Sequence, residues 1–305
     1  MADRSQDGRG ADRVAGRGPH RRGLLLGSAA LVLTGCGRGE EKAEPEVPGG
    51  PARGSLEWAV AGAWRAQDQA RDVWRHPMET LRYFGLRPRM TVADFWPGSG
   101  WYTEILAPYL KEGGGKYVAV GFQTGAGADP AQAQLNAAYM DRFSRDRRLY
   151  GEIEMSAFGP TSGPIADAGT VDLVLFMRTL HAWMAAGVAE KAFADAFQAM
   201  RPGAVLGVEQ HRLGPEQDQD PVAANGYVQE AFVRQLAAEA GFVFVGSSEI
   251  NANPEDEKDY PCGVDVLAPT RRGPEAGCEM TPEQRADYDA VGESDRMTLK
   301  FRKPE

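Results

Sequence analysis

The sequence is poor in histidine and cysteine: its 305 residues include four His and three Cys. The histidines lie far apart, and none is spaced from an acid as metal ligands are, so the sequence predicts no metal site. Internal repeats are also absent. The Gly-x-Ser-x-Gly pattern is missing as well, which argues against a hydrolase whose nucleophile sits on that elbow.

An excess of positive charge is lacking too. The formal net charge is -9, and residues 1–36 carry six Arg and three Asp, so the remainder is still more acidic. An acidic body repels the phosphates of DNA and RNA. We therefore expect no nucleic-acid partner.

No apolar run is long enough to span a bilayer. The longest one follows Arg21 and Arg22 and covers about a dozen residues, whereas a spanning helix needs about 20. A short apolar run behind basic residues is typical of a signal peptide. The Arg21-Arg22 pair resembles a twin-arginine export signal. Leu33 to Cys36 resembles the lipobox of bacterial lipoproteins, whose cysteine is acylated.

We therefore expect residues 1–36 to be an export and lipoprotein signal. Lipid on Cys36 would anchor the protein to the bacterial membrane, facing the periplasm. Residues 37–54 are rich in Gly, Pro and charge, which predicts a flexible tether, with the folded domain at 55–305. An oxidising compartment would allow Cys262 and Cys278 to form a disulfide; two free thiols are the alternative.

Beyond the tether, strand-like and helix-like segments alternate, as they do in a parallel sheet covered on both faces. The expected strands cover residues 91–95, 116–122, 171–177, 204–209, 242–245 and 297–302. The expected helices cover residues 55–75, 78–84, 102–110, 131–145, 189–200 and 228–240.

The first strand runs into a glycine-containing turn and then a helix. Asp94 lies at the strand end, and Gly98 and Gly100 follow in the turn. Glycines let the backbone approach a ligand closely, and the helix start offers unpaired N–H groups. The turn is therefore a candidate ligand site, although a tight turn that binds nothing has the same pattern.

The order of these segments resembles class I S-adenosylmethionine-dependent methyltransferases. The first motif of that family is an acid followed by glycines at alternate positions. Asp94, Gly98 and Gly100 match it, while Trp96 replaces the first glycine. Residues 171–176 and Arg178 resemble the family's fourth strand and the turn after it.

Further likeness extends the resemblance from about residue 58 to the end of the chain. Residues 200–204 resemble the Pro-Gly turn before the family's fifth strand, and residues 295–301 resemble its closing hairpin strand. Residues 96–104 and 71–77 are similar to a narrower group of predicted bacterial methyltransferases that are often exported. The resemblance implies a Rossmann-like, doubly wound α/β fold. Its sheet would have seven mostly parallel strands with an antiparallel closing strand, preceded by N-terminal helices.

The resemblance also implies S-adenosylmethionine as the cofactor and a small-molecule or cell-envelope acceptor. The residues expected to bind the cofactor are Asp94, Trp96, Gly98, Gly100, Trp101, Tyr102, Gln123 and Arg178. The aromatic members of this set have core packing as an alternative role.

One family feature is missing at the end of the second strand. Class I members usually carry an acid there that holds the ribose, and this place falls on Gly121. Gln123, two residues further, can form hydrogen bonds but has no charge. For the acid often found near the adenine, Ser156 and Asp167 are poor candidates.

The candidate catalytic residues follow the fourth and fifth strands, where ligands bind in open α/β sheets. His181 follows the fourth strand, and Glu209 and His211 follow the fifth. A histidine can act as the base when the methyl acceptor must lose a proton. The alternative is a catalytically inactive, ligand-binding lipoprotein, which the missing acid and the export signal favour.

Overall fold

The computed structural model describes residues 50–125 and 128–305. The expected signal peptide, Cys36 and most of the tether lie outside the described residues. The end of the expected tether contacts the folded domain, because Arg53 forms an ion pair with Glu112 at 3.1 Å. Within the described residues, no helix has the length and apolar character needed to cross a membrane.

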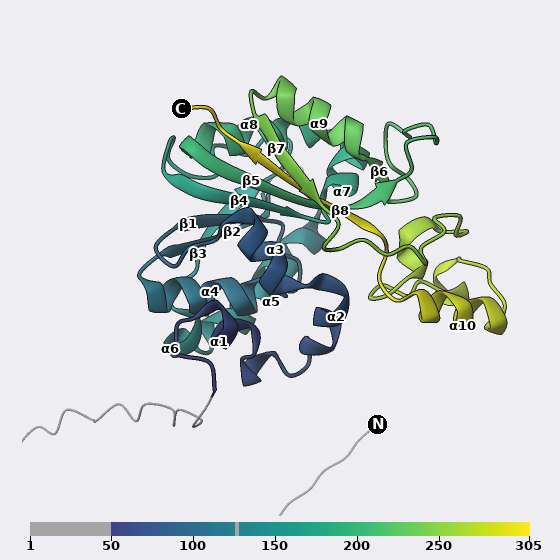
Figure 1. The fold of residues 1–305 in the computed structure, drawn as a ribbon, viewed down its shortest axis with the longest axis horizontal. Coiled ribbons are helices and arrows are strands. Elements are labelled where there is room, and N and C mark those ends of the chain that lie inside the picture. Colours follow the sequence, from purple (N-terminus) through teal and green to yellow (C-terminus); the bar gives the residue numbers. More distant parts are fainter. Residues whose placement is uncertain (1–49, 126–127) are drawn as a thin grey trace, which may run out of the picture. The chain divides into compact units, whose positions relative to one another are not determined.

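A mixed sheet forms the centre of the domain (Figure 1). Its order is β3 (Glu154–Phe158), β2 (Lys116–Phe122), β1 (Thr91–Phe95), β4 (Val171–Met177), β5 (Met200–Leu213), β8 (Arg296–Arg302) and β7 (Val243–Ser248). The first five strands of this order are parallel, and β8 is antiparallel to both β5 and β7. A short strand, β6 (Val228–Gln229), pairs with β5. The expected Rossmann-like α/β fold with an antiparallel closing strand is confirmed.

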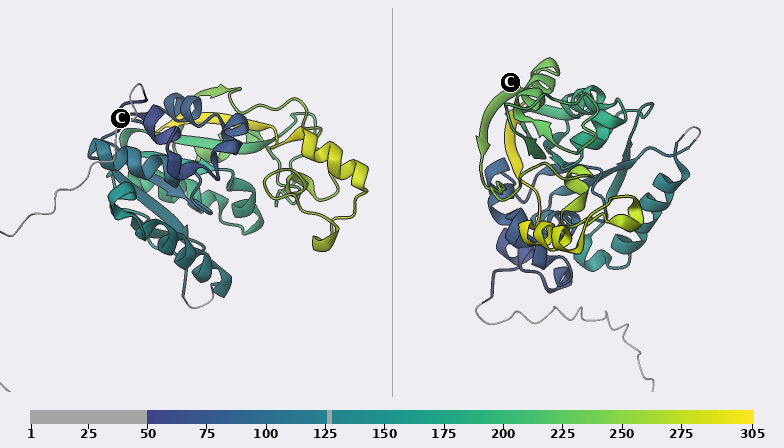
Figure 2. Two further views of the ribbon diagram at one scale, coloured as in Figure 1. Left: turned by 90° about the horizontal axis from the view of Figure 1, so that it is seen from below. Right: turned by 90° about the vertical axis from the view of Figure 1, so that its right-hand side faces the viewer.

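Helices cover both faces of the sheet (Figures 1 and 2). One face carries α1 (Leu56–Val60), α3 (Pro77–Phe84), α4 (Thr103–Gly113) and α5 (Pro130–Ser144), which share a buried apolar cluster with Val92 of β1. The other carries α7 (Leu180–Ala185), α8 (Ala189–Ala199) and α9 (Glu230–Glu239), which pack with Ala93 and Phe95. Side chains alternate across a strand, so β1 contributes to both cores. The remaining helices are α2 (Asp72–Arg75), α6 (Arg147–Tyr150) and α10 (Pro282–Val291).

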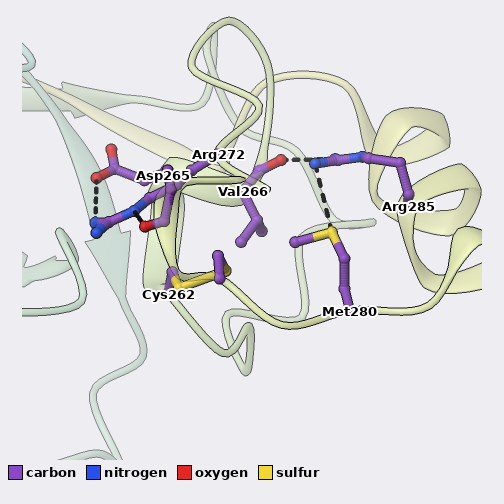
Figure 3. Close-up of a disulfide and its surroundings, with 8 residues drawn as sticks. Cys262, Asp265, Val266, Arg272, Met280 and Arg285 are labelled. Carbon is purple, nitrogen blue, oxygen red and sulfur yellow. Dashed lines mark hydrogen bonds and ion pairs between the residues drawn. A yellow bond between two sulfur atoms is a disulfide. The ribbon is translucent and has the colours of Figure 1, made fainter. Parts of the chain in front are cut away.

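A long segment, residues 249–295, joins β7 to β8; we call it the β7–β8 segment. It contains α10 and a disulfide between Cys262 and Cys278, whose Cα atoms lie 5.9 Å apart (Figure 3). Beside the disulfide, the Arg285 guanidinium donates to the Val266 carbonyl at 2.6 Å. The segment packs on the carboxyl end of β5, where the Arg212 guanidinium pairs with Asp295 at 2.8 Å. It therefore brings its own polar residues to the edge of the sheet where ligands bind in this fold class.

The expected strands at 91–95, 116–122 and 171–177 have the observed bounds. The single helix expected over 55–75 is wrong. α1 ends at Val60, and two 3-10 turns separate it from α2, because Arg65 is buried and donates to both the Val60 carbonyl and the Asp72 carboxylate. The helix expected over 228–240 begins at Glu230, since its first two residues pair with β5 as β6. β3, α6, α7 and α10 were not foreseen.

Candidate functional site

The loop between β1 and α4 has a left-handed backbone at three positions. Trp96, Gly98 and Gly100 have φ angles of 47°, 61° and 91°. Glycine adopts this region freely, whereas a residue with a Cβ atom costs roughly 1–2 kcal/mol there. Trp96 thus keeps the backbone shape that a glycine would have at this place in the family motif.

Aromatic contacts hold Trp96 in this conformation. Its ring centroid lies 4.6 Å from that of Phe122 and 5.8 Å from that of Trp183. Its indole N–H donates to the Phe158 carbonyl at 3.3 Å. These contacts place the indole over the carboxyl ends of β2 and β3.

A cavity with about 240 Å³ of empty space, part of it open to solvent, adjoins the loop. Its lining residues come from the loop, the end of β2, β3 and α5: Trp96, Pro97, Gly98, Gly121, Phe122, Leu135, Asn136, Tyr139 and Met155. A Cβ atom on Gly98 would meet nothing within 4 Å, whereas one on Gly100 would lie 2.3 Å from the Phe143 ring. Gly98 is therefore the open position of the loop, and Gly100 is closed by α5.

A buried hydrogen-bond chain connects Asp94 to this cavity. The Tyr117 hydroxyl donates to Asp94 Oδ2 at 3.0 Å, so its single proton is used there. Thr103 must then donate to Tyr117, and Tyr139 to Thr103, each across 2.9 Å. Among the residues that the structure describes, the buried Asp94 Oδ1 has no hydrogen-bond partner. Burial raises the pKa of Asp94 to about 7 despite the hydrogen bond from Tyr117.

At the end of β2, an amide stands beside the place of the missing acid. A Cβ atom on Gly121 would lie 2.7 Å from Asn136 Oδ1. The Asn136 side chain accepts from the Phe122 N–H at 3.0 Å and donates to the Phe122 carbonyl at 2.8 Å. Gln123 turns to Thr161 instead, donating to its hydroxyl at 2.6 Å and accepting from its N–H at 2.9 Å.

A second polar centre surrounds Glu293 of the β7–β8 segment. The nearest guanidinium and carboxylate atoms lie 2.8 Å apart for Arg75, 2.6 Å for Arg296, and 3.2 Å each for Arg71 and Arg178. Burial alone would raise the pKa of Glu293, but the attraction of Arg178, Arg75 and Arg296 lowers it to about 2. We call these four arginines with Glu293 the arginine cluster.

Glu209 of β5 joins the edge of this cluster. The Tyr102 hydroxyl donates to its Oε2 at 3.1 Å. Arg296 Nε lies 3.1 Å from its Oε1, close enough for an ion pair but not aligned as a hydrogen bond. Two cations contact the Trp101 ring, whose centroid lies 4.8 Å from the Arg75 guanidinium and 5.0 Å from that of Arg65.

The two candidate histidines lie together, with ring centroids 5.3 Å apart. His181 Nδ1 is 3.2 Å from the Gln210 amide nitrogen, and His211 Nδ1 is 2.5 Å from the Ser294 hydroxyl. Burial lowers the pKa of His181. It also lowers the pKa of His211 well below its usual range, and the charge of Arg178 adds to both effects. Both rings are therefore neutral at pH 7.

The predicted site residues divide between these two places. Trp96 and Gly98 line the cavity, and Asp94 reaches it through the hydrogen-bond chain. Arg178, Tyr102 and Trp101 contact the arginine cluster or Glu209 and are not among the residues that line the cavity. His181, His211 and Glu209 lie on the same side as the cluster. Across the described ranges, no group of three or more His, Cys, Asp and Glu residues is arranged to hold a metal ion.

Sequence reasoning missed Asn136, Tyr139, Arg75, Arg296 and Glu293. Arg75 belongs to the stretch 71–77, which carried the family likeness without an assigned role, and its partner is now seen to be Glu293. Arg296 likewise belongs to the stretch 295–301, which resembled the closing strand without an assigned role. Asn136, Tyr139 and Glu293 had no local signal, because their partners lie on other elements.

No family model matches the sequence, and no curated protein matches it. Solved structures do resemble the fold. The [4+2]-cyclase SpnF superposes with a TM-score of 0.51 over 75% of this chain and 80% of its own, at 16% identity. The sheet order with its antiparallel β8 decides the architecture. The chain has a Rossmann-like methyltransferase fold.

Two structures named as methyltransferases are also similar. A SAM-dependent methyltransferase from Aquifex aeolicus gives a TM-score of 0.47 and 19% identity, covering 63% of this chain and 93% of its own. Phosphoethanolamine N-methyltransferase 2 of Haemonchus contortus, in complex with S-adenosyl-L-methionine, gives 0.48 and 14%, covering 76% and 53%. At such identities the similarity concerns the fold alone.

Proposed function

We propose that this chain is an S-adenosylmethionine-dependent methyltransferase acting on a small-molecule or cell-envelope acceptor. The observation that carries the proposal is the open left-handed turn at Gly98, beside a cavity at the carboxyl end of β1. The turn leads into the N-terminus of α4, and the positive end of the helix dipole favours an anionic or polar ligand. In this class of sheet, ligands bind at that edge.

The residues around the cavity suit the proposed cofactor. Gly98 leaves open the space that a side chain would occupy, and Trp96 and Phe122 offer aromatic faces to an adenine. Asn136 supplies the polar side chain at the end of β2. When bound, the cofactor supplies an electrophilic methyl group, so the protein has mainly to position the acceptor in line with it.

The histidine pair suits proton removal from the acceptor. Its rings are neutral for the reasons given above, and a neutral imidazole can accept a proton. His181 Nδ1 accepts from the Gln210 amide, which leaves its proton on Nε2. We therefore assign the base to His211, in the tautomer whose Nδ1–H donates to Ser294 and whose Nε2 carries the lone pair that accepts the proton. Glu209 pairs with Arg296 and Tyr102, so we assign it to positioning of the cluster.

A second candidate function is ligand binding without catalysis. Its supporting observation is the absence of the ribose acid at Gly121. Without that acid the ribose lacks charge-assisted hydrogen bonds, which weakens cofactor binding. The two candidates therefore differ in whether adenosylmethionine binds at all.

Calorimetry on the full chain with adenosylmethionine and adenosylhomocysteine tests the proposal. We expect heat with both ligands. Gly98→Trp should abolish it by filling the turn, whereas the control Gly114→Trp should keep it. Gly114 has φ 77° and open space around its Cβ position, but it lies at the far end of α4. If neither ligand gives heat, the methyltransferase is excluded and the second candidate is favoured.

We also propose that the protein is exported and anchored through lipid on Cys36. The support is the sequence pattern at residues 1–36, together with the Cys262–Cys278 disulfide, which is typical of oxidising compartments. Labelling with a palmitate analogue compares wild type with Cys36→Ala. Label in the wild type alone is expected, and equal label in both would reject the anchor.

A further inference from the structure

The arginine cluster holds more positive than negative charge. Arg71, Arg75, Arg178 and Arg296 all contact the one carboxylate of Glu293. Arg296 has a second acid in Glu209 at 3.1 Å, and Arg71 has Asp68 at 3.4 Å. In the described part of the chain, no other acid lies within ion-pair distance of Arg75 or Arg178.

The excess charge is buried, which makes it costly. The side chain of Arg75 is 1% exposed, and its Nη2 has no hydrogen-bond partner in the part of the chain that the structure describes. A buried guanidinium without full pairing loses its hydration and gains too little in return. Burial, followed by repulsion from Arg178, lowers the pKa of Arg75 to about 9. The site therefore favours one further anion.

Two members of the cluster are open to such an anion. The side chains of Arg71 and Arg178 are 25% and 21% exposed. Arg178 follows β4 directly and has a left-handed φ of 61°, a strained conformation that in proteins often marks ligand sites. Its positive charge also contributes to the low pKa values of His181 and His211. An anion held by Arg178 would thus lie near the proposed base.

We infer that the methyl acceptor is an anionic small molecule whose carboxylate or phosphate oxygens bind Arg178 and Arg71, with Arg75 behind them. The identification of this anion as the methyl acceptor rests on the proposed function, whereas the anion site itself does not. Guanidinium groups match both oxyanions, since their N–H donors form paired, charge-assisted hydrogen bonds. Glu293 occupies part of the same donor set and holds the arginines in place before the ligand binds.

Calorimetry on the full chain without adenosylmethionine tests the anion site. The probes are inorganic phosphate, succinate and the uncharged succinamide. We expect heat with phosphate or succinate and none with succinamide. The anion that binds with the higher affinity identifies the acceptor as a phosphate or a carboxylate. Absence of heat with both anions at high millimolar concentration would overturn the inference.

Variants locate the binding. Arg178→Gln and Arg71→Gln should each lower the affinity for the anion roughly tenfold or more, since a charge-assisted hydrogen bond contributes roughly 1.5–3 kcal/mol. The control Arg234→Gln, an exposed arginine paired with Glu230 on α9, should leave it unchanged. Glu293→Gln should bind the anion more tightly, because it removes the internal carboxylate. Unchanged or weaker binding in that variant would mean that the anion does not use the donors that Glu293 occupies, which would overturn the inference.

Titrating adenosylmethionine into the wild type and into Arg178→Gln separates this inference from the proposed function. If both proteins bind the cofactor and the wild type binds neither anion, the anion site is wrong and the methyltransferase stands. If the wild type binds the anions and Arg178→Gln does not, but neither protein binds the cofactor, the anion site stands and the ligand is not a methyl acceptor.

Discussion

Two polar centres at the same edge of the sheet are stabilised in opposite ways. Beside β1 and β2, Asp94 is the end of a chain of hydroxyl groups from Tyr117, Thr103 and Tyr139, and burial raises its pKa. Beside β4 and β5, the Glu293 carboxylate is surrounded by cations, which lower its pKa. At pH 7 the same chemical group is thus about half protonated in one place and ionised in the other.

The difference shows which half of the edge depends on long-range contacts. The hydrogen-bond chain from Asp94 joins residues within β1, α4, β2 and α5, at most 36 positions apart in any one bond. The Arg75–Glu293 pair joins residues 218 positions apart and needs the β7–β8 segment in place. We expect the arginine cluster to fail first when that segment is disturbed.

Removing the central carboxylate gives the largest expected effect. Glu293→Ala leaves buried guanidinium groups without their shared partner, and breaking a buried ion pair costs roughly 3–5 kcal/mol of unfolding free energy. Urea denaturation measures this loss. The control Glu249→Ala removes an exposed carboxylate that pairs with Arg212, and should cost at most about 1 kcal/mol. Equal losses in the two variants would show that the cluster contributes no more than a surface pair.

Asp94→Asn tests the other centre through its pH dependence. The pKa of Asp94 is raised to about 7 in the folded protein, so it favours folding most at low pH, and this contribution is lost as pH rises through 7. Between about pH 5 and pH 8, the unfolding free energy of wild type should fall relative to the variant by roughly 2–3 kcal/mol.

The control for this comparison is Asp220→Asn. Asp220 is partly exposed, and backbone N–H groups of Ala224 and Val222 lower its pKa, so it stays ionised throughout this pH range. The difference in unfolding free energy between wild type and Asp220→Asn should stay constant between pH 5 and pH 8. A pH-independent difference for Asp94→Asn would mean that Asp94 is ionised in the folded protein.

The sequence predicted the first centre far better than the second. Strand bounds at β1, β2 and β4 followed from short apolar runs, and Asp94, Gly98 and Trp96 were found from one contiguous motif. Residues 71–77 were expected inside or next to a long helix, but there the ion pairs of Arg65 and Arg75 override helical propensity. Glu293 lies in a segment without a periodic pattern, so no local feature linked it to Arg75 or Arg178.

Restoring the missing acid gives the smallest expected effect in free energy and bears most directly on the cofactor. Gly121→Asp alone should be strained, because its Cβ would lie 2.7 Å from Asn136 Oδ1 and 2.9 Å from the Met155 methyl. Combined with Asn136→Ala, which removes the amide, the new carboxylate can accept from ribose hydroxyls. Such charge-assisted bonds contribute at least about 1.5 kcal/mol, so adenosylmethionine should bind roughly tenfold more tightly than in Asn136→Ala alone. An unchanged affinity in calorimetry would mean that the ribose does not lie at the end of β2, and the cavity beside Gly98 would then hold a different ligand.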